Sequence, residues 1–88
     1  MKVSFSDEAW EDYQHWVNND HKTLRRLNGL IEECRGNPFK GTGKPEPLKQ
    51  DLKGWGSRRI NGEDRLVYRV QGTDKDQLLE IIQCRLHY

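Results

Sequence analysis

A segment rich in proline and glycine divides the chain into two parts with different patterns. Residues 36–54 contain all three prolines and four of the eight glycines of the 88-residue sequence. Proline lacks a backbone N–H and restricts the residue before it to extended geometry. We therefore expect a stiffened, irregular loop here, with Lys44 and Glu46, which precede Pro45 and Pro47, in extended conformations.

The part before this loop has the pattern of one short strand and two helices. Residues 2–5 alternate like a strand, and a serine N-cap precedes a helix predicted over 7–18. Apolar residues recur along this helix at helical spacing, and we expect Trp10 and Trp16 in the core. Asp20 can cap a second helix, in which apolar residues lie three or four positions apart until a glycine ends it.

The part after the loop has the pattern of three strands. Alternation predicts strands over 55–60, 64–70 and 77–87, and an Asn-Gly dipeptide favours a tight hairpin turn between the first two. The order of elements is β-α-α-β-β-β. It predicts a single α+β domain over 1–88, in which two helices pack on one small antiparallel sheet.

Apolar runs, cysteines and charge limit the classes of function. No apolar run approaches the ~20 residues of a membrane helix, and the N-terminus lacks the apolar stretch of a signal peptide. We expect a cytoplasmic protein with no membrane or metal partner, whose Cys34 and Cys84 are reduced, buried thiols. Residues 40–69 hold eight Lys and Arg against four Asp and Glu, so an anionic partner would meet this stretch first.

The strand predicted over 64–70 carries an arginine face. If its apolar residues meet the helices, Arg65 and Arg69 point away from the core. Such a face is either a solvated surface with scattered charges or a basic platform for a phosphate backbone. On the last strand, apolar residues share the parity of Arg85 and His87, so a bulge or an edge position must separate the two roles.

Two further residues could carry acid–base chemistry. Glu46 lies between two prolines and among lysines, and is either a surface carboxylate or a base beside an anion site. His87, next to the C-terminus, is either solvated or docked and able to exchange a proton near neutral pH. A carboxylate, an imidazole and arginines suit RNA cleavage by its own 2′-OH, which requires no metal or cofactor. The residue types permit this chemistry without selecting it.

Six short motifs give the sequence a resemblance to a known family over nearly its whole length. They are E-A-W-E-D-Y at 8–13, N-P-F at 37–39, G-K-P-E-P-L-K at 43–49, S-R-R-I at 57–60, R-L-V-Y at 65–68 and C-R-L-H-Y at 84–88. The set resembles the YoeB-type toxins of the RelE/ParE superfamily, which are bacterial ribosome-dependent mRNA interferases. One departure is Gly56, where the family tends to have a second aromatic residue, so no stacking role carries over to that position.

The resemblance implies a RelE/ParE-like fold and a role for each matching residue. Glu46 would be the general base and His87 the general acid. Arg65 would stabilise the phosphate in the transition state, and Tyr88 would complete the site. The residues then expected to bind RNA are Lys44, Lys49, Arg58, Arg59 and Arg69.

The resemblance further implies the toxin of a type II toxin–antitoxin system, which cleaves mRNA in the ribosomal A site and so inhibits translation. The implied partners are mRNA, the 70S ribosome, a YefM-type antitoxin and a second toxin copy. Two alternatives stay open: a ParE-like toxin that binds DNA gyrase without cutting RNA, and a non-catalytic RNA-binding or antitoxin-sequestering relic. Glu46 and the terminal His-Tyr argue against the gyrase alternative.

Overall fold

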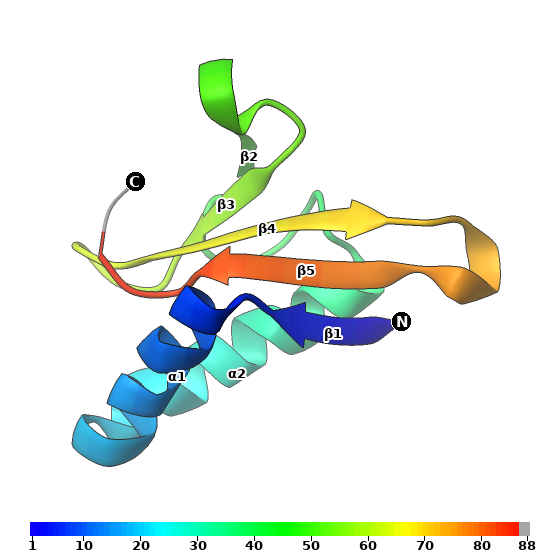
Figure 1. Cartoon of the computed structure of the whole chain (residues 1–88). Coiled ribbons are helices and arrows are strands. Elements are labelled where there is room, and N and C mark those ends of the chain that lie inside the picture. The colour runs from blue at the N-terminus through cyan, green and yellow to red at the C-terminus, as the bar shows by residue number, and fades with distance from the viewer. Residues whose placement is uncertain (87–88) are drawn as a thin grey trace.

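The computed structural model describes residues 1–86 as two helices packed on one face of a five-stranded sheet (Figure 1). The helices are α1 (Asp7–Asn19) and α2 (His21–Gly36), and the single 3-10 turns are η1 (Gln50–Leu52) and η2 (Asp74–Asp76). The strands are β1 (Lys2–Phe5), β2 (Glu46–Pro47), β3 (Gly56–Arg59), β4 (Arg65–Gln71) and β5 (Leu78–Gln83). The expected α+β class is confirmed. None of the helices in this part of the chain is long and apolar enough to cross a membrane.

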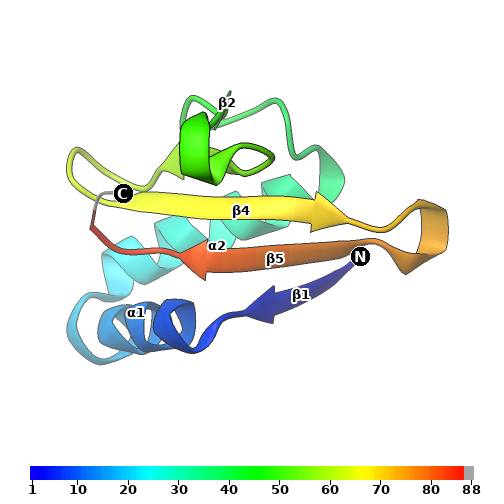
Figure 2. The ribbon, with the colours of Figure 1, turned by 45° about the horizontal axis from the view of Figure 1, so that its top comes forward.

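The strands lie in the order β1-β5-β4-β3-β2, and Figure 2 shows α2 running behind the central strands. The pairs β2–β3, β3–β4 and β4–β5 are antiparallel, whereas β1 runs parallel to β5. The sheet is therefore mixed, which corrects the expectation of a wholly antiparallel one. Short connections force β3, β4 and β5 to alternate in direction, but no such connection joins β1 to its partner.

The expected helix caps and most of the expected core are confirmed. Ser6 Oγ accepts a hydrogen bond from the Ala9 N–H at 3.1 Å, and Asp20 Oδ1 accepts one from the Thr23 N–H at 3.1 Å. Trp16 is buried, but Trp10 is half exposed, which corrects its expected place in the core. The core contains Ala9, Trp16, Leu27, Leu30, Ile31, Cys34, Ile60, Leu66, Tyr68, Leu79, Ile81 and Cys84.

A bulge in the β4–β5 pair resolves the parity conflict of the last strand. Val67 pairs with Gln83 while Tyr68 pairs with Ile81, so β5 contains one extra residue. The strand also ends at Gln83, four residues before the predicted end. It ends there because side chains of α1 bind both backbone groups of Cys84: the Asp12 carboxylate accepts its N–H, and the Trp16 indole donates to its carbonyl.

The segment between α2 and β3 is more ordered than a plain loop. Glu46 and Pro47 form the short edge strand β2, which the sequence analysis did not predict. Lys44 has a φ of 52°, in the left-handed region, which corrects its expected extended geometry. The chain must turn sharply here because the Gly43 carbonyl accepts a hydrogen bond from the Arg59 N–H at 2.7 Å.

Two glycines of this region should respond oppositely to replacement by alanine. A Cβ at Gly56 would lie 3.4 Å from the Tyr68 ring, which is ordinary contact, and its φ suits any residue. Gly56→Ala should therefore raise the free energy of unfolding by about 0.4–1 kcal/mol through the unfolded state. At Gly43, with a φ of +87°, a Cβ would lie 2.9 Å from the Arg59 carbonyl oxygen, so Gly43→Ala should destabilise by about 1–3 kcal/mol. Urea unfolding of the two variants tests this order, and the reverse order would refute it.

Candidate functional site

Three charged residues expected at the site share one face of adjacent strands. Glu46 on β2 pairs with Ser57 on β3, and Arg59 on β3 pairs with Arg65 on β4. Paired residues share a face and side chains alternate along a strand, so Glu46, Arg59 and Arg65 point to the same side. Leu66, next to Arg65, belongs to the core against the helices. The shared face is therefore the one that the helices leave uncovered.

Glu46 stands on an edge strand whose backbone is fixed on both sides. Its neighbour Pro47 has no N–H to donate, which an edge strand tolerates. Beyond it, the Leu48 N–H donates to the Trp55 carbonyl at 2.9 Å and closes the segment back onto the sheet. Glu46 itself is exposed. Its carboxylate thus stands at the rim of the sheet, accessible to a large ligand.

Arg65 is held by the turn that precedes it. Its Nη1 donates to the Asn61 carbonyl at 2.9 Å and to the Asp64 carbonyl at 3.1 Å. The Asn61 side chain in turn accepts the N–H groups of Glu63 and Asp64, both at 2.8 Å. The sequence analysis assigned Asn61 only to a hairpin turn and missed that it orients Arg65; an Asx turn before an arginine was the available signal.

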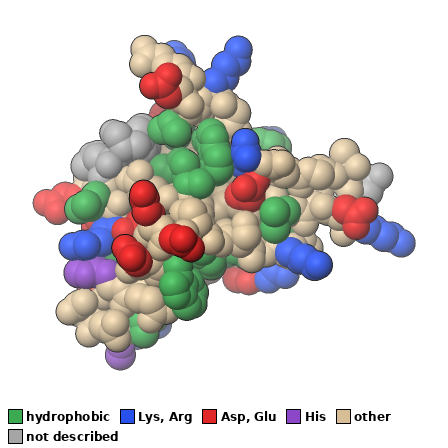
Figure 3. Space-filling view, viewed as in Figure 1, with side chains coloured by type: hydrophobic (Ala, Val, Ile, Leu, Met, Phe, Trp, Pro, Cys, Tyr) green, Lys and Arg blue, Asp and Glu red, His purple; other side chains and the backbone are tan. Residues whose placement is uncertain are grey.

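The basic residues around this face differ in accessibility. Lys44, Lys49 and Arg59 are exposed. Arg69 is engaged within the sheet: its Nε donates to Glu80 Oε1 at 3.0 Å, and its guanidinium carbon lies 4.3 Å from the centre of the Trp55 ring. Figure 3 shows that the face seen in Figure 1 carries both signs of charge, with Lys and Arg scattered rather than gathered into one patch.

Arg58 does not lie on this surface, which corrects its expected role in binding RNA. The residue is fully buried and directed to the opposite side of the sheet. Its Nη2 donates to the carbonyls of Asn37 at 2.7 Å and Lys40 at 2.9 Å, and its Nη1 donates to that of Thr42 at 3.1 Å. The Nη groups of the guanidinium thus form hydrogen bonds with the backbone of the loop after α2, and are not available to a ligand on the surface.

Two side chains complete the surroundings of the Arg58 guanidinium. Arg58 Nε donates to the Tyr68 hydroxyl at 3.4 Å, and Glu33 Oε1 lies 3.6 Å from Nη1. Hydrogen bonds from Thr42, with the charge of Arg58 as a smaller cause, hold the pKa of the Glu33 carboxyl below its ordinary value. Glu33 therefore stays ionised opposite the buried cation at neutral pH.

A pocket of about 480 Å³ opens beside β2. Phe39, Trp55, Tyr68 and Arg69 line it together with Glu46 and three prolines. It provides an apolar, aromatic hollow at the edge of the charged face. Gly56 also lines this pocket.

His87 and Tyr88 lie outside the described residues. Cys34 and Cys84 are free, buried thiols, as expected. Burial raises the pKa of both thiols, that of Cys84 to about 12, so neither forms a reactive thiolate at neutral pH.

Comparison with known proteins identifies the family. A family described as YoeB-like toxin of bacterial type II toxin-antitoxin system matches residues 5–88. This chain belongs to that family. A Toxin YoeB of Streptomyces coelicolor is 52% identical over 88 residues and another of Escherichia coli is 51% identical, each aligned over 100% of both chains.

Solved structures agree with this assignment. A YoeB/ParE toxin from Agrobacterium tumefaciens superposes with a TM-score of 0.98 at 48% identity, over 100% of both chains. A YoeB from Staphylococcus aureus, in a heterotetrameric complex of YoeB-YefM toxin-antitoxin, gives a TM-score of 0.87 at 42% identity, over 100% of this chain and 98% of that one. The structure of a YoeB dimer from the same organism gives 0.85 at 42% identity, with the same coverage. The RelE-like α+β fold and the place of this chain among toxins of toxin–antitoxin systems are thereby established.

Replacing Arg58 should damage the fold rather than the charged face. Arg58→Ala leaves three loop carbonyls and the partly exposed Glu33 without their buried partner, so the free energy of unfolding should fall by about 1–3 kcal/mol or more. Arg59→Ala, one residue along and exposed, is the matched control and should change it by less than about 0.5 kcal/mol. Urea midpoints of the two variants measure the contrast; equal midpoints would show that the buried network contributes little.

Proposed function

We propose that this toxin is a ribosome-dependent endoribonuclease that cleaves mRNA in the ribosomal A site. The observation that carries the proposal is the register that puts Glu46, Arg59 and Arg65 on one face of neighbouring strands, the face that the helices do not cover. A carboxylate beside guanidinium groups can accept a proton while the guanidinium groups bind a phosphate. Glu46 and Arg59 are exposed on this face and accessible to a large nucleic-acid substrate.

The proposed reaction uses the RNA's own 2′-OH as nucleophile. The Glu46 carboxylate takes the 2′-OH proton, and the oxygen attacks the adjacent phosphorus. The bond from phosphorus to the 5′ oxygen breaks, and His87 gives that oxygen a proton. Arg65 stabilises the negative charge on the phosphoryl oxygens in the transition state, and Tyr88 completes the site. Glu46 ends protonated and His87 deprotonated, and the cleaved strand carries a 2′,3′-cyclic phosphate.

RNA binding is proposed to rest on phosphate contacts from the exposed basic residues. Lys44, Lys49 and Arg59 present their charges to solvent around the face of Glu46. Arg69 adds a cation stacked on Trp55 at the pocket. Such contacts give affinity without sequence preference.

The proposed partners are mRNA, the 70S ribosome, a YefM-type antitoxin and a second toxin copy. The antitoxin and the second copy are supported by the Staphylococcus aureus relatives, one solved with YefM and one as a dimer. An activity on translating ribosomes places the toxin in the cytoplasm.

The proposal is tested by toeprinting of programmed ribosomes on a defined mRNA. The wild-type toxin should create a new mRNA end at the A-site codon. Glu46→Gln should cut about 10²–10⁴-fold more slowly because the amide cannot accept the proton. Asp51→Asn, an exposed carboxylate on η1, is the matched control and should cut at the wild-type rate.

Two results would count against the proposal. Wild-type cleavage by Glu46→Gln would remove Glu46 as the base while keeping the nuclease activity. No cut by the wild-type toxin, together with growth arrest in cells, would refute the nuclease and favour the gyrase-binding alternative.

Salt dependence tests the phosphate contacts separately. The affinity for a short single-stranded RNA should fall as salt rises, with a log–log slope of about −0.7 for each phosphate bound. Lys49→Ala and Arg59→Ala should each make that slope shallower by about 0.7. Lys75→Ala, an exposed lysine on η2, should leave it unchanged. Fluorescence anisotropy at several salt concentrations measures the slopes, and a flat wild-type profile would contradict the basic platform.

A further inference from the structure

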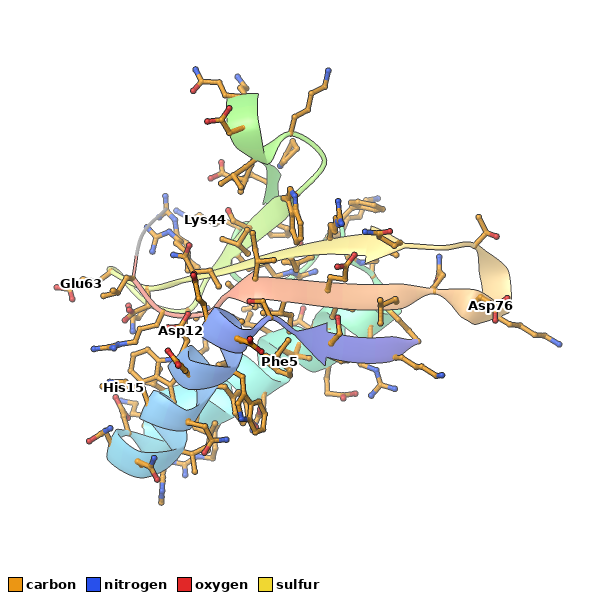
Figure 4. All side chains as sticks on the ribbon, viewed as in Figure 1. Phe5, Asp12, His15, Lys44, Glu63 and Asp76 are labelled. Carbon is orange, nitrogen blue, oxygen red and sulfur yellow. The ribbon has the colours of Figure 1, made fainter. Side chains whose placement is uncertain are left out.

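The backbone after β5 is tied to the rest of the molecule residue by residue. At Cys84, the N–H donates to Asp12 Oδ2 at 3.1 Å and the carbonyl accepts from Trp16 Nε1 at 2.8 Å. Figure 4 shows Asp12 on α1, close to the end of β5. Both contacts anchor the first residue of the tail to α1.

A second set of contacts holds the next two residues from the side of β4. The Leu86 N–H donates to Asp64 Oδ1 at 2.7 Å, and the Leu86 carbonyl accepts from the Arg65 N–H at 3.1 Å. Gln83 Nε2 donates to the carbonyls of Arg85 and Leu86, both at 3.1 Å. Residues 85–86 therefore lie against the turn that leads into β4.

Asp64 is itself fixed and buried. Only 8% of it is exposed, its N–H donates to Asn61 Oδ1, and its carbonyl accepts from the Ile60 N–H at 3.0 Å. These bonds hold the backbone of Asp64 at the position from which its carboxylate accepts the Leu86 N–H. Nothing in the sequence had singled out this residue.

Leu86 adopts a conformation that its side chain does not explain. Its φ is 67°, in the left-handed region that residues other than glycine rarely adopt. Its side chain is largely exposed, so packing does not fix the conformation. Such a backbone persists only where its surroundings over-determine it. The bonds from Asp64, Arg65 and Gln83 to the Leu86 backbone supply that constraint.

We propose that Asp64, with Gln83, is a positioning residue that fixes the direction in which the chain leaves Leu86 toward the C-terminal His-Tyr. The inference rests on the proposed function, in which His87 is the general acid. The tether joins the two halves of the reaction, because the Asp64 carboxylate accepts the Leu86 N–H and the N–H of the adjacent Arg65 donates to the Leu86 carbonyl. Asp64 thus holds both Arg65, which stabilises the phosphate in the proposed reaction, and the segment that leads to His87, the proposed acid.

The direct test compares Asp64→Ala with Asp64→Asn. Alanine removes the acceptor, so exchange of the Leu86 amide hydrogen should become about tenfold faster or more. The kcat of ribosomal mRNA cleavage should fall about 10²-fold with little change in KM, since misplacing a reacting group by about 1 Å has an effect of this size. Asparagine keeps a carbonyl oxygen and should restore most of both.

A double-mutant cycle separates positioning from general loss of structure. If Asp64 acts through His87, then Asp64→Ala should change the cleavage rate by less than about twofold in a chain that already carries His87→Ala. Equal losses in both backgrounds would overturn the proposal, as would faster Leu86 exchange with unchanged kcat.

Two further outcomes of these experiments also have a defined meaning. If Asp64→Ala does not fold, Gln83→Leu removes the side chain that binds the carbonyls of Arg85 and Leu86, and an unchanged kcat in that variant refutes the tether. If the wild-type toxin does not cleave RNA, the proposed function has failed. The tether itself is then still judged by whether Leu86 exchange responds to Asp64→Ala and recovers with Asp64→Asn.

Discussion

The buried guanidinium of Arg58 joins the loop after α2 to the sheet, and the place of the candidate site depends on this link. Its N–H groups serve three loop carbonyls and the Tyr68 hydroxyl, which an arginine fork can do in one plane. The loop leads directly into β2, so fixing it decides where that edge strand can join β3. Arg58, which faces the helices, therefore helps to place Glu46 on the same face as Arg59 and Arg65.

The turn between β3 and β4 provides a second constraint. Asn61 and Asp64 orient the Arg65 guanidinium through their carbonyls, and the Asp64 carboxylate holds the chain at Leu86. A bulge in β5 and the capture of Cys84 by α1 bring residues 84–86 to this turn. Segments from both ends of the chain thus meet at one corner of the sheet, where small changes in backbone direction would alter the geometry of the charged face.

Local sequence predicted what local forces control. The caps at Ser6 and Asp20, the two helices and the three main strands follow from capping chemistry, periodicity and turn residues, and all were found. The incorrect predictions concern features that depend on contacts between residues far apart in the sequence. Trp10 fits the same helical periodicity as Trp16 but is half exposed. Strand β1 pairs with β5, which is far away in the sequence, so no turn motif could predict this pairing. Alternation places Arg58 and Arg59 on opposite faces of β3, but it could not show that Arg58 is the buried one.

The sequence by itself determined the element order, the α+β class and the family, because periodicity, caps and short motifs are written in consecutive residues. It also singled out Glu46 and Arg65 through the resemblance those motifs carry. Only the tertiary structure decided that β2 exists, that Arg58 is a buried support, and that Asp64 binds the tail. Each of these depends on strand pairing or hydrogen bonds between residues 9 to 22 positions apart, and the packing of the sheet selects these partners.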